Sequence, residues 1–321
     1  MNNRLLLDVP LQPTIGSRFQ PTGFPDIGAA EFLRPLPDGA PPERCVLVES
    51  AQSMANRLEG TAWDDGEDAP VALFHGLPFV RVVNEDGRYL TSSRTEAHRL
   101  ASAFVKDAKL DGTEMRTVIK ERLGLQDDTP TPLRQVASAV FALDPFCLVH
   151  GVFFADGKWP GQPKVARALT GFIEAEGVQR ADSGGVKRDH VRHSLDGASG
   201  GTAEGYGTVP YHRVEWTAQR IIASFSVDLR QLGSYGLGED AAGLLEAIAL
   251  WEIRTLLDGG LRLRTACDLE PVNEAARFRD GTPLPGHDEL AERIEQGKAA
   301  CHDRFGEGAP LEVTWSAKKK S

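Results

Sequence analysis

A strand that leads directly into a helix near residue 50 is the feature that most constrains the fold of this 321-residue chain. Residues 45–49 (CVLVE) form a continuous apolar run, which is typical of a strand in the interior of a sheet. Ser50 is suited to cap the helix that follows, which continues to Glu59 with apolar residues at helical spacing and ends at Gly60. A strand and a helix joined without a loop predict a sheet with helices packed on one face.

Further segments supply the rest of such a sheet. Residues 146–155 and 168–176 have strand-like patterns, and residues 220–229 alternate between apolar and polar side chains, as a half-buried strand does. Residues 239–258 are apolar nearly all round, which indicates a helix packed deep in the protein, and residues 261–269 alternate again. The order of these elements predicts an α+β fold with an RRM-like, or ferredoxin-like, sheet.

Other segments lie outside this predicted sheet. Eight prolines between residues 10 and 43 argue against long helices and predict an extended, proline-rich arm over residues 1–43. Residues 61–145 combine a hairpin at 71–93 with three helical stretches, near 94–109, 113–123 and 131–142, and form one insertion. Residues 181–217 begin with a mobile glycine-rich stretch and form a second insertion.

The predicted core sheet therefore consists of residues 44–60, 146–180 and 218–270. Residues 271–321 form a C-terminal extension, with a polar helix near 288–303 and a last strand at 311–315.

Composition narrows the class of function. A net charge of −10 argues against a protein that coats nucleic acid with its whole surface, but it leaves room for a local basic groove. No run of about 20 apolar residues is present, and the N-terminus does not resemble a signal peptide. The four cysteines form no CxxC pair, which favours free thiols. We therefore expect a cytoplasmic protein without membrane contact.

The polar side of the 50–59 helix is the most informative candidate surface. It carries hydroxyl, amide and guanidinium groups in place of the usual lattice of Glu and Lys, and such groups contact phosphate and sugar. The start of the helix also offers backbone amides to an anion. The helical spacing places Arg57 opposite the apolar stripe, so its side chain should be free to meet a phosphate. An ordinary polar surface without a ligand is the alternative. The candidate residues are Ser50, Gln52, Ser53, Asn56 and Arg57.

Basic side chains also occur in the glycine-rich stretch. Lys187, Arg188 and Arg192 lie among glycines, and such a segment can mould itself to a phosphate backbone. A mobile loop without a ligand explains the same composition. Arg262 and Arg264 share one face of a later strand and could meet phosphate, although pairing with nearby acids is the default expectation.

The usual catalytic and metal-binding motifs are missing. The sequence has no GxSxG elbow, no HExxH helix and no phosphate-binding loop ending in GK[ST]. His190 and His193 have a spacing that a helix could present to zinc, but further ligands are not close in sequence. Phe153 and Phe154 lack the flanking pattern of an RNA-binding aromatic motif, which favours core packing. We expect no enzymatic activity, no metal and no cofactor.

Five segments, in the same order, resemble the backbone proteins of type I-G (formerly I-U) CRISPR interference complexes. They are 49–59 (ESAQSMANRLE), 150–155 (HGVFFA), 167–175 (RALTGFIEA), 205–213 (GYGTVPYHR) and 260–264 (GLRLR). The resemblance implies a RAMP-superfamily protein with an RRM-like palm, a helical finger region and a thumb. It also implies that several copies polymerise head to tail along one CRISPR RNA (crRNA). The insertions at 61–145 and 181–217 occupy the places of the finger and the thumb.

The resemblance further implies which residues and partners are involved. The helix would grip the RNA backbone through Gln52, Ser53, Asn56 and Arg57, and the thumb through Lys187, Arg188, Arg192 and Arg213. The implied partners are crRNA, further copies of the chain, the large subunit, the fused subunit that binds the repeat end, and the target DNA strand through guide pairing. Because type I relatives leave cutting to a recruited helicase-nuclease, the expected function is non-catalytic guide binding.

Two other functions remain open at this point. One is a RAMP-type endoribonuclease that processes precursor RNA, with His190 or His212 as general acid or base. The other is a protein-only scaffold, which would bind no nucleic acid.

Overall fold

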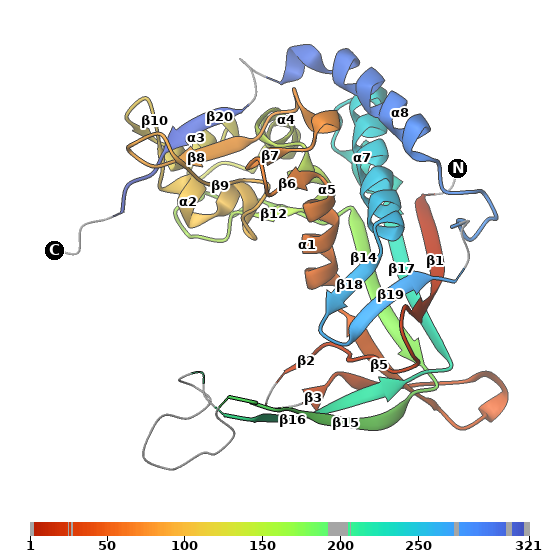
Figure 1. Cartoon of the computed structure of the whole chain (residues 1–321). Coiled ribbons are helices and arrows are strands. Elements are labelled where there is room, and N and C mark those ends of the chain that lie inside the picture. Colours follow the sequence, from red (N-terminus) through yellow and green to blue (C-terminus); the bar gives the residue numbers. More distant parts are fainter. Residues whose placement is uncertain are drawn as a thin grey trace.

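The structure, a computed structural model, describes residues 3–24, 26, 28–191, 205, 207–272, 276–305 and 310–317. Figure 1 shows an open C, with a large sheet at its back, a smaller α/β lobe at the upper left and a two-stranded ribbon along the bottom. The helices α7 (Glu239–Asp258) and α8 (His287–Ala300) run along the upper part of the back. The α+β class predicted from the sequence is confirmed.

A seven-stranded antiparallel sheet organises the larger part of the chain. Its strand order is β18-β19-β1-β17-β14-β5-β4. The bounds of these strands, from one edge to the other, are Leu261–Arg264, Cys267–Pro271, Arg4–Pro13, Arg220–Asp228, Leu169–Glu176, Glu43–Glu49 and Glu31–Arg34. The sequence predicted β18 and β19 as one strand, and the structure corrects this to a hairpin with a register shift between Arg262 and Arg264.

The first strand, β1, corrects the prediction that residues 1–43 form an arm outside the sheet. It pairs with β17 from Arg4↔Asp228 to Leu11↔Ile221, and its C-terminal end pairs with β19. Leu7, Val9 and Leu11 alternate into the core. The sequence interpretation did not recognise this strand because it contains prolines at positions 10 and 13, and proline is uncommon in interior strands. The chain therefore follows a β-α-β-β-α-β path through β1, α1, β14, β17, α7 and β19.

The helix α1 (Ala51–Thr61) follows β5 directly, as predicted. The Ser50 side chain caps it by accepting a hydrogen bond from the Ser53 backbone N–H at 3.2 Å. Its apolar stripe packs against β14, where Gly171 permits a close approach. A Cβ atom at position 171 would lie 2.7 Å from Cδ1 of Phe225 and 3.0 Å from Cγ of Met54. A larger residue there would clash with the side chains of Phe225 and Met54.

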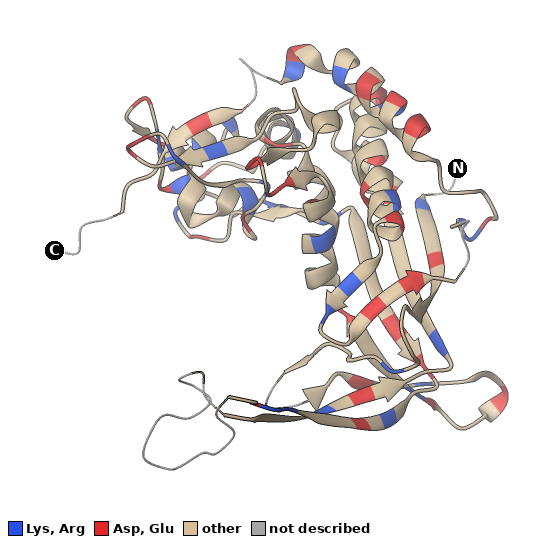
Figure 2. Ribbon diagram, in the orientation of Figure 1, with Lys and Arg blue, Asp and Glu red and all other residues tan. Residues whose placement is uncertain are grey.

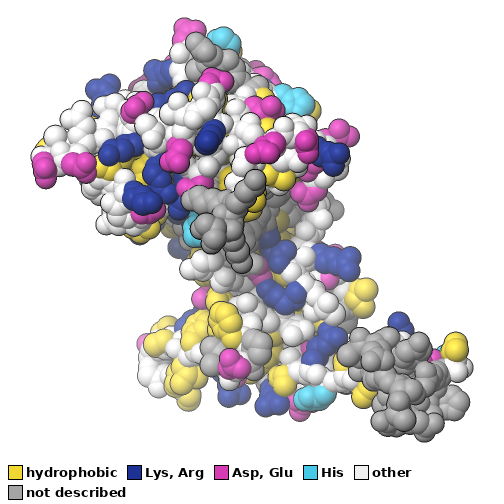
Figure 3. Space-filling view, turned by 90° about the vertical axis from the view of Figure 1, so that its left-hand side faces the viewer, with side chains coloured by type: hydrophobic (Ala, Val, Ile, Leu, Met, Phe, Trp, Pro, Cys, Tyr) yellow, Lys and Arg dark blue, Asp and Glu magenta, His cyan; other side chains and the backbone are white. Residues whose placement is uncertain are grey.

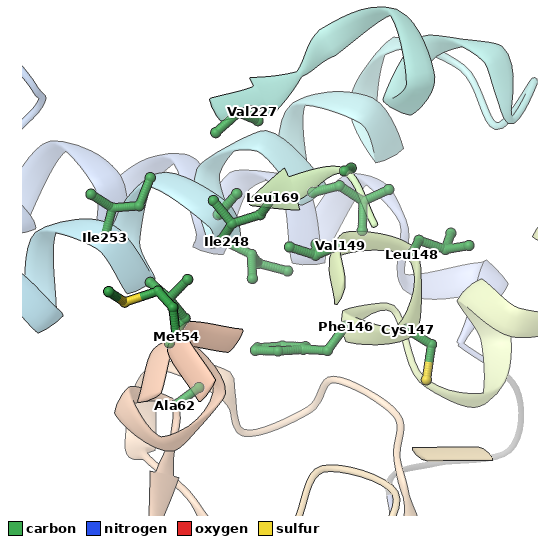
Figure 4. Close-up of a cluster of buried hydrophobic side chains, with 14 of the residues drawn as sticks. Met54, Ala62, Phe146, Cys147, Leu148, Val149, Leu169, Val227, Ile248 and Ile253 are labelled. Carbon is green, nitrogen blue, oxygen red and sulfur yellow. The ribbon is translucent and has the colours of Figure 1, made fainter. Parts of the chain in front are cut away.

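The core joins α1, α5 (Phe146–His150), α7 and the sheet. Figure 4 shows Ile248 and Ile253 of α7 near Met54 of α1, with Leu169 of β14 and Val227 of β17 in the same cluster. The bounds of α7 agree with the sequence prediction, because a helix that is apolar on most sides is buried on most sides. Among the described residues, no helix has the length and apolar character needed to cross a membrane.

The smaller lobe contains residues 61–145 and is completed by the C-terminal strand. Its five-stranded sheet has the order β11-β10-β20-β8-β9, and β20 runs parallel to β8. The bounds of these strands, in the same order, are Thr113–Glu114, Lys109–Leu110, Leu311–Thr314, Val80–Val83 and Tyr89–Ser92. The helices are α2 (Ala103–Lys106), α3 (Met115–Arg122) and α4 (Leu133–Leu143). The last strand thus belongs to the sheet of the insertion.

The predicted strand at 146–155 is wrong over its first half, which forms α5. The Asp144 carboxylate accepts a hydrogen bond from the Phe146 N–H at 3.1 Å and so supports the start of this helix. An apolar run without alternation fits a buried helix as well as a buried strand. Only β12 (Val152–Phe153) is extended, and it pairs with β13 (Lys164–Val165).

The glycine-rich segment is more ordered than predicted where the structure describes it. β15 (Gln179–Lys187) and β16 (Val209–Thr217) form an antiparallel ribbon over their whole length. Residues 192–204, predicted to be mobile, lie outside the described residues. The remaining short elements are β2 (Gly23–Phe24), β3 (Gly28–Ala29), β6 (Trp63–Asp64), β7 (Ala69–Pro70) and α6 (Leu229–Ser234).

Candidate nucleic-acid interface

The helix α1 lines the inner side of the C, between the smaller lobe and the ribbon (Figure 1). Figure 3 looks onto this side and shows Lys and Arg side chains gathered at the narrow waist between the two parts. Many acidic side chains lie on other parts of the molecule: Figure 2 shows several on α8, where Asp288, Glu289, Glu292 and Glu295 are exposed. The net negative charge of the chain is therefore compatible with a basic inner side.

Two arginines share one buried carboxylate at the start of α1. Glu49, the last residue of β5, is fully buried, and its Oε1 lies 2.9 Å from Nε of Arg57. Its other oxygen pairs with the Arg264 guanidinium of β18. Arg57 also donates to the carbonyls of Arg262 and Leu263, and Arg264 donates to the carbonyl of Val48 at 2.9 Å. We call Glu49, Arg57 and Arg264 the arginine pair site.

This geometry corrects the prediction that the Arg57 side chain is free. A buried carboxylate is costly unless it is paired, and Glu49 satisfies this requirement through the two arginines and the Ser53 hydroxyl, which also donates to it. The side chains of Arg57 and Arg264 nevertheless stay 26% and 25% exposed. With two positive charges on one carboxylate, the site carries a net charge of +1 and faces solvent.

The other predicted residues of α1 divide into two groups. Ser50 and Ser53 serve the helix itself, one as its cap and the other as a donor to Glu49. Gln52 and Asn56 are exposed, and neither side chain has a hydrogen-bond partner among the residues that the structure describes. Each borders a separate hollow. These two amides therefore remain available to a ligand.

A hollow of about 660 Å³ separates the arginine pair site from the ribbon. Arg180 of β15 and Arg213 of β16 line it together with Arg264 and the exposed ring of Phe24. The Arg213 guanidinium lies over the Tyr211 ring, 5.2 Å from its centroid. The structure thus brings Arg213 to the same hollow as Arg264. The sequence interpretation missed Arg180. This residue lies opposite Trp216 in the ribbon, and its position depends on the pairing register of β15 and β16.

Lys187 and Arg188 lie elsewhere on the ribbon. Both are exposed, at the end of β15 that projects away from the sheet in Figure 1. Arg192 and His193 lie outside the described residues. The structure therefore does not bring Lys187 and Arg188 together with the arginine pair site.

The histidines divide by burial. His150 and Glu252 form a fully buried pair, with Nε2 2.8 Å from Oε2 of the glutamate. Burial lowers the pKa of His150 to about 4 and raises the pKa of Glu252 well above its usual range, so burial disfavours the charged form of both groups. His212 is exposed on the ribbon, 3.7 Å from the Asp182 carboxylate. Among the described residues, no group of three or more His, Cys, Asp or Glu side chains could hold a metal ion.

Phe153 corrects the prediction that both adjacent phenylalanines pack in the core. Phe154 is fully buried, whereas the Phe153 side chain is 47% exposed on β12. Because successive residues of a strand point to opposite faces, only one of the two can enter the core.

A family model described as "CRISPR-associated protein GSU0053" matches residues 5–180 of the chain. The chain belongs to this CRISPR-associated family. The matched region includes β1, α1 and β14, and thus Glu49 and Arg57 of the arginine pair site. The CRISPR association that the sequence resemblance implies is confirmed.

Two further comparisons add little to the family assignment of this CRISPR-associated protein. None of the curated proteins matches it. It is similar to a chain from a solved structure titled "CRISPR RNA-guided surveillance complex, pre-nicking", with 12% sequence identity over 99% of this chain and 92% of that chain. The TM-score of 0.41 is low, so this likeness supports no conclusion about the site.

Proposed function

We propose that this CRISPR-associated protein is the crRNA-binding backbone subunit of a type I-G Cascade complex. The observation that carries the proposal is the arginine pair site on the inner side of the C, in a chain whose family is CRISPR-associated. The site offers positive charge and hydrogen-bond donors, which contact phosphate and sugar and carry no sequence information. It suits a guide RNA, which must be held by its phosphates so that its bases remain free to pair.

The arginine pair site is prepared for a phosphate before RNA arrives. Each guanidinium has five N–H donors, and among the described residues each donates to three backbone or carboxylate oxygens. The remaining donors are held in place by the same contacts, so little side-chain entropy is lost when a phosphate binds. The exposed amides of Gln52 and Asn56 extend this surface along α1.

The fold supports the same function. The strand order β19-β1-β17-β14, with α1 and α7 as the two helices, fits an RRM-like palm. The lobe of residues 61–145 would be the finger, and the ribbon of β15 and β16 would be the thumb. Copies arranged head to tail would place one inner side after another along a single crRNA, alongside the large subunit and the fused repeat-end subunit. Target DNA would be bound through pairing with the guide.

The proposed role is non-catalytic. The alternative, a RAMP-type endoribonuclease, is favoured by one observation: His212 lines the same hollow as Arg213 and lies near Asp182. Incubation of the protein with repeat RNA, with and without divalent metal, distinguishes the two. We expect intact RNA; site-specific cleavage that is lost in His212→Ala would support the endoribonuclease.

Coexpression with a CRISPR array tests the RNA-binding role directly. We expect the purified protein to carry RNA, seen as a high 260/280 absorbance ratio and a ladder of guide-length species. Arg264→Gln should reduce this loading. Arg4→Gln is the matched control, because Arg4 is an exposed, ion-paired arginine at the start of β1. Nucleic-acid-free wild-type protein would support the scaffold instead.

A further inference from the structure

A second hollow flanks the start of α1 and contains positive groups that the proposed interface does not use. It has a volume of about 530 Å³ and lies between α1, the β12–β13 pair and the turn around residue 98. Its polar lining consists of Gln52, His98, Arg99, His150, Lys164, Arg167 and Thr170.

The charges in this hollow are not balanced. Arg99 pairs with both oxygens of Glu59, at 2.6 and 2.7 Å, and also donates to a backbone carbonyl. Arg167 donates to the Ala51 carbonyl at 2.8 Å, but no carboxylate lies within ion-pair distance of it among the described residues. Burial and the neighbouring Arg99 charge lower the pKa of Arg167. A partly buried cation beside a second cation is a setting that an anion stabilises.

Lys164 adds a further positive charge at the rim. Its Nζ lies 5.6 Å from the centroid of the exposed Phe153 ring, and it has no acidic partner within the described part of the chain. The backbone holds both residues in place, because Phe153 of β12 and Lys164 of β13 are direct partners in an antiparallel strand pair. Cationic groups next to an exposed aromatic ring are the combination that binds single-stranded nucleic acid.

We propose that this hollow binds one phosphodiester of the guide RNA, with Arg167 and Lys164 as phosphate ligands and the Phe153 ring as a stacking surface for the adjoining base. This inference rests on the proposed function and adds to it the route that the RNA follows along the surface of the protein. The two sites differ in their charge balance: Arg57 and Arg264 both pair with Glu49, whereas only Arg99 of the second site pairs with Glu59. The guide would thus follow α1 between the two sites.

Salt titrations of RNA binding test the phosphate ligands. Lys164→Gln and Arg167→Gln should each make the log–log slope of affinity against salt shallower, and the double variant should make it shallower by about 0.7 per protomer, because the two side chains together neutralise one phosphate. Lys158→Gln is the matched control, since Lys158 is exposed in the same loop but does not line the hollow. Lys164 is exposed, so its variant should fold even if replacement of Arg167 disturbs the start of α1.

A second titration tests the stacking surface. Phe153→Leu should weaken binding by roughly 5- to 150-fold with an unchanged salt slope, which corresponds to the loss of one stacked base. The effect should shrink when an abasic RNA is used, because that RNA has no base to stack.

The outcomes separate this inference from the proposed function. Wild-type protein that binds no RNA would contradict both. RNA binding that is equal in the wild type, Lys164→Gln, Arg167→Gln and Phe153→Leu would contradict the second site alone and leave the arginine pair site in place.

Discussion

Replacing Glu49 with glutamine tests whether the arginine pair site is organised by one buried charge. The change keeps the size of the side chain but leaves Arg57 and Arg264 without their common counter-ion. Removing one partner of a buried ion pair costs about 3–5 kcal/mol. Because both arginines are about a quarter exposed and can be solvated, we expect the lower end, about 3 kcal/mol.

Bound RNA should reverse part of this loss. A phosphate between the two guanidinium groups would supply the negative charge that glutamine lacks, so the variant should gain more stability from RNA than the wild type does. Two thermal melts, of free and of RNA-loaded protein, measure the gain for each form. A cost of about 3 kcal/mol should lower the melting temperature of the free variant by roughly 6 °C.

The surface ion pair of Arg4 and Asp228 provides the control for Glu49→Gln. Arg4→Gln removes a surface ion pair, with the Arg4 side chain 59% exposed, and should change stability by less than about 1 kcal/mol in either form. Equal destabilisation of free and RNA-loaded Glu49→Gln would refute the argument, because it would mean that no phosphate reaches the two arginines.

Three further predictions follow from other contacts. Arg57→Ala should fold, since Glu49 keeps its ion pair with Arg264. The variant should make the log–log salt slope of RNA binding shallower by about 0.7 per protomer, and an unchanged slope would mean that Arg57 does not contact a phosphate. Gly171→Val should destabilise the protein by about 2 kcal/mol in urea unfolding, because the buried side chains of Phe225 and Met54 must shift, and unchanged stability would contradict the packing. Glu252→Gln should alter the pH dependence of unfolding. The raised pKa of Glu252 means that the folded wild type binds the extra proton and loses stability as pH rises above about 4.5, the ordinary glutamate value. The lowered pKa of His150 acts oppositely between about 4 and 6.5. Because both proteins keep His150, the wild type should lose stability relative to the variant as pH rises from about 4.5, and parallel curves would contradict the pair.

Elements with a strong local pattern could be predicted from the sequence. The helix after β5, the alternating strand β17 and the buried helix α7 all appear close to their predicted bounds. Periodicity is a local property, so a single sequence is enough to recognise it. The polar side of α1 was also predicted correctly as a surface, and Gln52 and Asn56 are exposed on it.

Elements whose identity depends on distant partners were predicted poorly. β1 belongs to the sheet because it lies between β17 and β19, strands that come more than 200 residues later in the chain. β20 joins the sheet of the smaller lobe by pairing with β8 from the first third of the chain. Strand pairing is a contact between remote segments, and no local pattern reports it.

The same distinction applies to the site. The sequence by itself determined that α1 presents amide, hydroxyl and guanidinium groups, because helical spacing assigns each side chain to a face. Only the tertiary structure decided that Arg57 is tied to Glu49, and that Arg264, 207 positions further along the chain, shares that carboxylate. It also decided that Arg167 lies beside Arg99 without an acid of its own. Charge balance depends on which side chains folding brings together, and a sequence lists the charges without their distances.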